Sequence, residues 1–244
     1  MIQFYAPDIE SLAVLPEGES VHCCRVLRMK DGDEIIVTDG KGNRFRCEII
    51  KSHPAHTEVR IIEKETLPSE HDYFLTLAVA PTKNSDRMEW MAEKAVEIGV
   101  DRIVLLKCDR SERKVMRPDR LEKVMAAAMK QSLSTRMPLL EEVTSLEKFV
   151  KGADGKAQKF FGYCSEQFPR KELVKELHPG GEVIIMIGPE GDFSPKEVQT
   201  AVEEGFVPVT FGNKRLRTET AGVFAVVAVN IINQLTQADY TFTG

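Results

Sequence analysis

The stretch Val183–Val198, VIIMIGPEGDFSPKEV, reads as a strand, a tight loop and the start of a helix. Val183–Ile187 is a continuous apolar run, which is typical of a strand buried on both faces of a parallel sheet. The glycines and the proline of Gly188–Gly191 predict a turn. Ser194–Glu197 (SPKE) is a capping box with proline at the first helical position, so a helix should begin there. This order predicts an α/β fold with a loop at the carboxyl end of a strand.

A second stretch, Val209–Ala221 (VTFGNKRLRTETA), repeats this order. Gly212–Lys214 should end its strand, and Thr218 or Thr220 should cap the last helix. That helix, Ala221–Leu235, is apolar nearly all round, so it is either a core helix or packed against a second subunit. Two loops with exposed backbone N–H groups at strand ends suit a ligand at the carboxyl edge of the sheet.

The remainder of the chain divides into a β-rich part and an α/β part. Residues 1–68 contain short alternating segments and turn signals, which predict a compact barrel. The polar segment Thr66–Asp72 is the predicted domain boundary, and strands alternate with helices after it, so a mostly parallel sheet is expected. The further elements predicted are strands at Phe74–Ala80, Ile103–Leu106 and Phe160–Tyr163, and helices at Asp86–Ile98, Pro118–Gln131 and Lys171–Leu177.

Composition points to a soluble globular protein, with 42% hydrophobic and 29% charged residues. No apolar run approaches the roughly 20 residues that span a bilayer, and the N-terminus lacks the pattern of a signal peptide. The five cysteines are an odd number without CxxC spacing. A disulfide framework and a metal site are therefore not expected, and a cytoplasmic location fits best.

Charge is distributed unevenly along this acidic chain, whose net charge is −5. Lys107–Lys123 holds seven basic and four acidic residues. Such a segment is equally well explained as a polyanion contact and as a solvated surface. Arg25 and Arg28 would lie one turn apart if His22–Lys30 is helical, and could then project together; an ordinary surface charge pair is the alternative.

The residues alone favour a site built from Glu190, Arg217, Thr218 and Glu219 beside exposed amides. No GxGxxG follows a strand, and the chain has no Walker A loop, nucleophile elbow or HExxH motif. Turn chemistry and helix capping explain either of the two stretches taken singly. Their occurrence at corresponding strand ends of one domain favours a binding site.

The pairing of Gly188-Pro189-Glu190-Gly191 with Leu216–Ala221 (LRTETA) resembles the SPOUT methyltransferases. More narrowly, it is similar to the bacterial enzymes that methylate N3 of one uridine in 16S ribosomal RNA. The resemblance covers nearly the whole chain. Further stretches that match this family are His22–Arg28 with Gly32-Asp33, Lys83–Gly99, Arg110–Arg113, and Gln131-Ser132 followed by Pro138.

Two departures from the family pattern stand out. Asp192 occupies a position where the family usually has a second glycine after GPEG. Leu133-Ser134 replaces a Gly-Arg pair, which removes a cation that Arg136 could supply instead.

The resemblance implies a PUA-like RNA-binding barrel in residues 1–68. It implies a SPOUT domain in residues 72–244 that is tied in a trefoil knot, binds S-adenosylmethionine and forms a homodimer. The expected partner is 16S ribosomal RNA or the small ribosomal subunit, with no membrane and no metal. The implied cofactor-binding residues are Ile187, Gly188, Pro189, Glu190, Gly191, Phe211, Gly212, Leu216, Arg217, Thr218, Thr220 and Ala221. The implied RNA contacts are Arg25, Arg28, Lys83, Arg110, Arg113, Lys114 and Arg136.

Methylation of uracil N3 sets the chemistry expected of the site. The imide nitrogen becomes a good nucleophile only when its proton leaves, and negative charge then spreads to the carbonyl oxygens. Arg217 is the candidate for stabilising that charge. Glu190 and Glu219 are candidates for accepting the proton or for orienting Arg217, and Glu190 could equally be a structural brace.

Two other functions compete with this hypothesis. One is a non-catalytic RNA-binding or ribosome-assembly factor that retains the fold. The other is a different α/β transferase that uses a nucleotide, which the missing phosphate-loop glycines disfavour.

Overall fold

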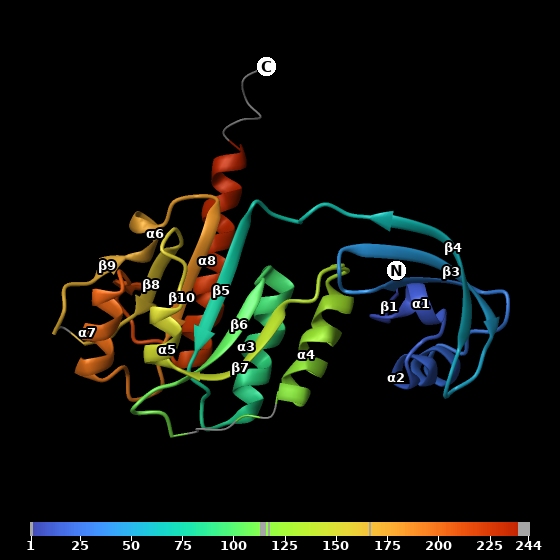
Figure 1. The fold of residues 1–244 in the computed structure, drawn as a ribbon, viewed down its shortest axis with the longest axis horizontal. Coiled ribbons are helices and arrows are strands. Elements are labelled where there is room, and N and C mark those ends of the chain that lie inside the picture. The colour runs from blue at the N-terminus through green and yellow to red at the C-terminus, as the bar shows by residue number, and fades with distance from the viewer. Residues whose placement is uncertain (1, 113–115, 117, 166, 239–244) are drawn as a thin grey trace, which may run out of the picture. The chain divides into compact units, whose positions relative to one another are not determined.

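The computed structural model describes residues 2–112, 116, 118–165 and 167–238 (Figure 1). The chain forms two compact units: Met1–Glu70 with Ala126–Met137, here the N-terminal unit, and His71–Met125 with Pro138–Gly244, here the C-terminal unit. The polar sequence around residue 70 marks the first passage between them. The sequence gives no sign that Ala126–Met137 joins the N-terminal unit.

The N-terminal unit is a four-stranded sheet in the order β1-β2-β3-β4. The pair β1–β2 is parallel and the other two pairs are antiparallel, with a register shift in β3–β4 between Arg46 and Cys47. Alternate side chains of β3, namely Phe45, Cys47 and Ile49, are fully buried, as its period-two pattern predicts. Its elements are β1 (Gln3–Tyr5), α1 (Ile9–Leu12), α2 (Glu17–Val21), η1 (His22–Val26), β2 (Glu34–Thr38), β3 (Asn43–Lys51) and β4 (Glu58–Thr66).

Arg25 and Arg28 do not share a regular helix. The π-helical segment η1 ends at Val26, and Arg28 has a φ of +56°. The condition under which the two cations were expected to project together is therefore not met. Both side chains are nevertheless exposed.

The C-terminal unit is built on a seven-stranded sheet in the order β7-β6-β5-β10-β8-β11-β9, and every pair in it is parallel. This confirms the predicted α/β fold with a mostly parallel sheet. Its elements are β5 (Tyr73–Val79), α3 (Ser85–Ile98), β6 (Arg102–Lys107), α4 (Pro118–Gln131, which runs on into the N-terminal unit), β7 (Leu139–Ser145), α5 (Leu146–Lys151), β8 (Gln158–Gly162), β9 (Lys171–Glu172), α6 (Leu173–Glu176), β10 (Gly181–Ile187), α7 (Pro195–Glu203), β11 (Val207–Thr210) and α8 (Thr218–Ala238).

Helices cover both faces of this sheet (Figure 1). Helices α5 and α7 pack on one face, where their apolar residues join Phe161 and Met186 in one core cluster. Helices α3 and α8 pack together on the other face, with α8 against β5 and β10. The two helices approach closely at Gly222, where a Cβ atom would lie 2.7 Å from the sulfur of Met91. A side chain at Gly222 would therefore force them apart.

Helices α3, α5 and α7 start at a side-chain cap. The Asn84 side chain caps α3, and Ser194 with Glu197 forms the predicted capping box of α7. The prediction that Thr218 or Thr220 caps α8 is wrong, because α8 already begins at Thr218. The predicted helix Lys171–Leu177 is present only in part, as α6 (Leu173–Glu176). A two-residue strand comes first, because Lys171 and Glu172 pair with β11 at the sheet edge.

Helix α8 is the most apolar element of the unit. The stretch Thr218–Leu235 is long and apolar enough to cross a membrane by length and composition, yet half of it is buried inside the protein. Phe224, Ile231 and Leu235 are exposed, at 39, 48 and 64%. These spacings place the three side chains on one face of the helix.

Candidate active site

Three strand-end loops form a cleft of about 810 Å³ at the carboxyl edge of the sheet. The loops follow β8, β10 and β11, and the last of them leads into the first turn of α8. Ile187, Leu216 and Ala221 contribute apolar side chains to the lining. Because parallel strands end at one edge, loops far apart in sequence meet there.

The loop after β10 is held by side chains from its neighbours. The Thr218 hydroxyl donates to the Gly188 carbonyl oxygen (3.1 Å), which ties this loop to α8. Arg110 Nη1 donates to the Gly191 carbonyl oxygen (2.9 Å), so this predicted RNA contact braces the loop. Glu197 accepts from the Asp109 amide (2.8 Å). The loop is therefore preorganised before any ligand binds.

Asp192 closes the loop in a conformation that favours glycine. Its φ is +64°, in the left-handed region that aspartate tolerates better than most residues. Its carboxylate accepts from the amides of Phe193 (2.9 Å) and Cys164 (3.1 Å). Asp192, which departs from the family pattern, thus links the loop after β10 to the loop after β8. Leu133, the other departure, also has a positive φ, of +60°.

Cys164 lines the cleft but is not an activated thiol. Partial burial, and then the nearby Asp192 carboxylate, raises the pKa of this thiol. The thiol is therefore protonated near neutral pH and is a poor nucleophile.

Glu219 lies in the first turn of α8 and pairs with Arg87 of α3. Arg87 Nε is 3.6 Å from Glu219 Oε1, and the two side chains are 41% and 9% exposed. The carboxylate also lies at a helix N-terminus, where the helix dipole attracts a negative charge. Arg87 lies within a stretch matching the family, but no pattern in the sequence predicts that it faces Glu219.

Arg217 and Glu190 differ in how they are held. Arg217 lines the cleft with an exposed side chain, and its guanidinium makes no ion pair with any residue that the structure describes. Glu190 Oε1 accepts from the Lys83 amide (3.3 Å), and the Glu190 carbonyl oxygen accepts from Arg215 Nη2 (3.2 Å). These contacts agree with the interpretation of Glu190 as a structural brace, although Glu190 also lines the cleft.

Most predicted cofactor residues meet in this cleft. Gly191 and Thr220 are not part of its lining. The predicted residues in the lining are Ile187, Gly188, Pro189, Glu190, Phe211, Gly212, Leu216, Arg217, Thr218, Glu219 and Ala221. The charged residues of the lining that the sequence did not single out for this site are Arg87, Arg170, Asp192, Lys214 and Arg215.

The predicted RNA contacts are scattered. Lys83 Nζ lies 3.2 Å from Glu112. Arg136 donates to the Leu67 carbonyl oxygen (2.8 Å) and packs against Gly42, so its guanidinium is committed within the N-terminal unit. Arg113 and Lys114 lie outside the described residues.

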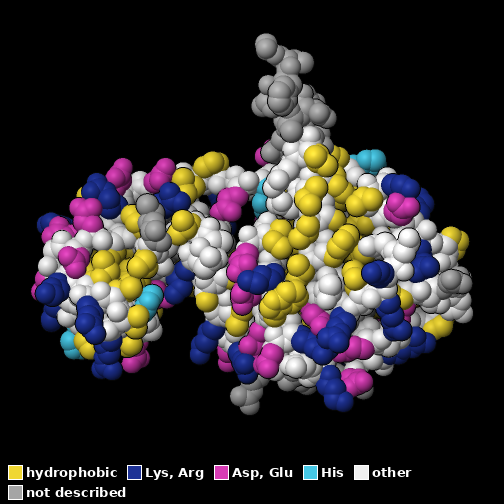
Figure 2. Space-filling model, turned by 180° about the vertical axis from the view of Figure 1, so that it is seen from behind, with side chains coloured by type: hydrophobic (Ala, Val, Ile, Leu, Met, Phe, Trp, Pro, Cys, Tyr) yellow, Lys and Arg dark blue, Asp and Glu magenta, His cyan; other side chains and the backbone are white. Residues whose placement is uncertain are grey.

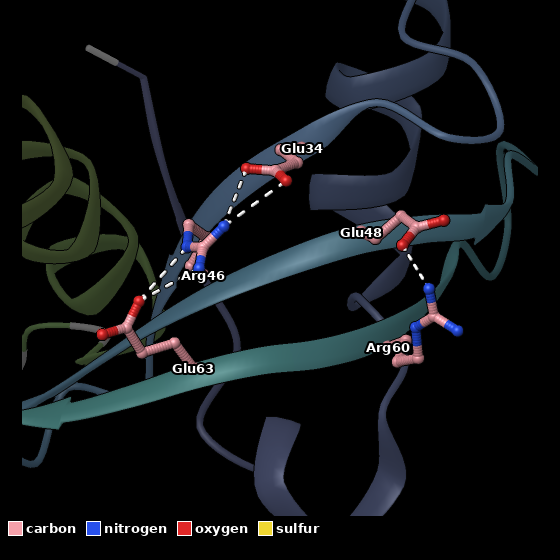
Figure 3. Close-up of polar contacts among 5 residues, drawn as sticks. All are labelled: Glu34, Arg46, Glu48, Arg60 and Glu63. Carbon is pink, nitrogen blue, oxygen red and sulfur yellow. Dashed lines mark hydrogen bonds and ion pairs between the residues drawn. The ribbon is translucent and has the colours of Figure 1, made fainter.

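The solvent face of the N-terminal sheet carries paired charges (Figure 3). Arg46 bridges Glu34 and Glu63 at 3.3 and 3.2 Å. Arg60 pairs with Glu48 on the neighbouring strands. With carboxylates beside each cation, this face presents little net charge to a polyanion.

No group of three or more His, Cys, Asp or Glu residues in the described ranges is placed to hold a metal ion.

A parallel α/β unit with a cleft at its carboxyl edge, following a small β unit, defines a two-part α/β protein with a ligand site at the sheet edge. The model of the RNA methyltransferase domain matches residues 69–230. The model of the RNA methyltransferase PUA domain matches residues 15–62. The chain therefore belongs to the RNA methyltransferase family.

Relatives match along nearly the whole chain. The Ribosomal RNA small subunit methyltransferase E of Bacillus subtilis is 26% identical, over 91% of each chain. The crystal structure of a probable rRNA-methyltransferase from Porphyromonas gingivalis is 40% identical with a TM-score of 0.93, covering 97% of this chain and all of that one. A small subunit methyltransferase E from Neisseria gonorrhoeae, bound to S-adenosyl methionine, is 27% identical with a TM-score of 0.85, covering 95% and 98%. These matches confirm the predicted SPOUT-type fold with its PUA-like domain; the trefoil knot stays a prediction.

Proposed function

We propose that this protein is an S-adenosylmethionine-dependent methyltransferase that modifies N3 of a uridine in 16S ribosomal RNA. The observation that carries the proposal is the cleft that Arg217 lines together with the buried Glu219 and its partner Arg87. The names of the relatives support the substrate and the cofactor. The choice of N3 rests on the resemblance and on the chemistry of the site.

The cleft suits the cofactor. Its volume of about 810 Å³ falls in the range typical of small-molecule sites. Within the described chain, the backbone N–H groups of residues 212–217 make no hydrogen bond, so they are available as donors. Gly188, Gly212 and Leu216 would hold the adenosine moiety with backbone groups and apolar surface. When bound, the cofactor supplies an electrophilic methyl group on a sulfonium.

The charged residues of the cleft have separate roles in the methylation of the uracil. Arg217 stabilises negative charge on the carbonyl oxygens as the N3 proton leaves. Glu190, which lines the cleft, accepts the proton, directly or through water. Glu219 is held by Arg87 and orients the first turn of α8, which Arg217 directly precedes. The target nucleotide must be unstacked to enter, which suits a single-stranded or loop uridine.

The two parts of the chain have separate roles in this proposal. Residues 1–68 form the RNA-binding domain, with the exposed Arg25 and Arg28 as phosphate contacts, and residues 72–244 form the methyltransferase domain. The protein acts in the cytoplasm, where ribosomal RNA is modified, and needs neither a metal nor a membrane.

The protein forms a homodimer through the exposed apolar face of α8. Figure 2 shows hydrophobic side chains gathered over this helix, and Phe224, Ile231 and Leu235 are its exposed members. Such a stripe is costly to leave in water. Light scattering should give twice the chain mass for the wild type and a shift to monomer for Ile231→Glu, whereas Leu12→Glu, at an exposed apolar site of the N-terminal unit, should stay dimeric. A monomeric wild type would overturn this assignment.

The function is tested by binding and by mapping. Calorimetric titration should give saturable binding of S-adenosylmethionine. Mass mapping of 16S ribosomal RNA from cells lacking the protein should reveal one uridine without its N3 methyl group. The wild-type gene should restore the methyl group and Arg217→Ala should not, although that variant still binds the cofactor. A protein that binds RNA but no cofactor, and whose loss leaves every methylated uridine intact, would instead be the assembly factor.

A further inference from the structure

The loop between β11 and α8 is cationic. Residues 212–217, GNKRLR, contain Lys214, Arg215 and Arg217 and no acidic residue, and all three line the cleft. The whole lining holds five cations against the carboxylates of Glu190, Asp192 and Glu219. The cleft mouth is thus locally positive on a chain whose net charge is −5. A positive cleft on an acidic protein concentrates an anionic partner there.

Lys214 is an uncommitted cation of this loop that has no role in the proposed chemistry. Its side chain is exposed, and it makes no hydrogen bond or ion pair with any residue in the described ranges. Arg110, predicted to contact RNA, instead donates to the backbone carbonyl oxygens of Gly191 (2.9 Å) and Phe193 (3.3 Å), in the loop after β10. Lys214 and Arg215 therefore line the cleft although the sequence patterns did not single them out as RNA contacts.

Arg215 has one of its guanidinium nitrogens engaged. Nη2 donates to the Glu190 carbonyl oxygen (3.2 Å), in the loop after β10. The other N–H groups of this exposed side chain make no hydrogen bond with the part of the chain that the structure describes. Because a guanidinium presents several donors in a fixed fork, Arg215 can hold the loop and an anion together.

We propose that Lys214 and Arg215 form a phosphate clamp that binds the backbone of the RNA strand next to the target uridine. This inference rests on the proposed function. Lys214 contributes charge alone, whereas Arg215 also links the bound strand to the loop after β10 through its hydrogen bond to Glu190. Placing phosphates here orients the strand so that the unstacked base enters the cleft.

The carboxylate of the cofactor is a second anion that these cations could bind. The two cases differ in what a substitution changes. A phosphate contact affects RNA affinity and its salt dependence, whereas a carboxylate contact affects cofactor affinity. Lys214→Gln separates them, because Lys214 braces no described residue whose loss would disturb the cleft.

The test measures RNA and cofactor binding separately. Fluorescence anisotropy with a labelled single-stranded fragment of 16S ribosomal RNA between 50 and 200 mM salt gives Kd and its salt slope, and calorimetry gives cofactor Kd. For Lys214→Gln we expect RNA Kd to rise about 3- to 10-fold, the slope to fall by about 0.7, and cofactor Kd to change less than twofold. For Arg215→Gln both dissociation constants should rise.

The matched control is Lys151→Gln. Lys151 is an exposed lysine of the same unit that pairs with Glu147 and does not line the cleft, so both dissociation constants and the slope should stay at wild-type values. An unchanged slope in Lys214→Gln, or a rise in cofactor Kd alone, would overturn the clamp. The RNA-binding measurement does not depend on methyl transfer. A wild-type protein that binds RNA but methylates no uridine N3 would therefore contradict the proposed function without contradicting the phosphate clamp.

Discussion

Arg87 Nε lies 3.6 Å from Glu219 Oε1 and joins α3 to the first turn of α8 at the cofactor cleft. Glu219 is almost fully buried, so its carboxylate depends on this cation and on the helix N-terminus for stabilisation. The pair sets the position of the first turn of α8, which Arg217 directly precedes. This ion pair links two parts of the site that are distant in the sequence.

Replacing one partner of the Arg87–Glu219 pair should lower the free energy of unfolding more than replacing both partners. We expect Arg87→Gln to lower the free energy of unfolding by about 1–2 kcal/mol, because the buried carboxylate is left without its cation and Arg87 itself is partly solvated. The double variant Arg87→Gln/Glu219→Gln should recover part of that loss. Urea unfolding of the two single variants and the double variant gives the coupling energy. Additive single effects would contradict a direct interaction.

Asp192 should set cofactor affinity through its backbone conformation and its two hydrogen bonds. Asp192→Ala loses both acceptors and puts alanine, which tolerates the left-handed region less well than aspartate, at a φ of +64°, so cofactor Kd should rise about 10-fold. Asp192→Gly loses the acceptors but adopts this φ freely, and Asp192→Asn keeps one acceptor and tolerates it. Calorimetry should therefore rank the affinities Asn above Gly above Ala. Equal affinities for all three variants would show that the loop does not depend on Asp192.

Local sequence signals predicted the elements around the site closely. The capping boxes and the apolar periodicity predicted α7 from Ser194 and α4 over Pro118–Gln131. These signals are short-range, because a cap is satisfied within one turn and a buried face recurs every three to four residues. The carboxyl edge of the sheet could likewise be predicted, since β10 and β11 each end in a loop with turn-forming residues.

Partners between distant segments could not be predicted in this way. Nothing near Arg87 indicates Glu219, and nothing near Arg110 indicates the carbonyl of Gly191. A surface arginine and a bracing arginine have the same local pattern, so basic stretches overstate the number of available RNA contacts. The strand Lys171–Glu172 was missed for a related reason, because only its pairing with β11 makes it a strand.

The exposed arginines of the N-terminal unit should contribute to RNA affinity electrostatically. In Arg25→Gln/Arg28→Gln we expect weaker RNA binding at every salt concentration and a salt slope lower by about 0.7 for each lost phosphate contact. Arg46→Gln is the control, because Arg46 is already paired with Glu34 and Glu63 (Figure 3). Anisotropy titrations should show a near wild-type slope for Arg46→Gln. An equal loss in the two variants would mean that net charge, and not a defined contact, drives binding.

The stability of the N-terminal unit should fall at alkaline pH through Cys47. This thiol is fully buried in the core of the sheet, and burial raises its pKa from the ordinary value of 9.0 to about 11. A raised pKa in the folded state means that the stabilising proton is fully bound below pH 9, and that its contribution is lost as the pH rises from 9 to 11. The full shift corresponds to at most about 2.7 kcal/mol.

The comparison with Cys47→Ala isolates this group from other titrating residues. The variant should be less stable than the wild type at pH 8, because it leaves a small cavity. The difference in urea midpoint, followed by circular dichroism, should then shrink between pH 9 and 11, since only the wild type carries the thiol. A difference that stays constant over this range would mean that Cys47 titrates equally in the folded and unfolded chains, and that its burial does not disfavour the thiolate.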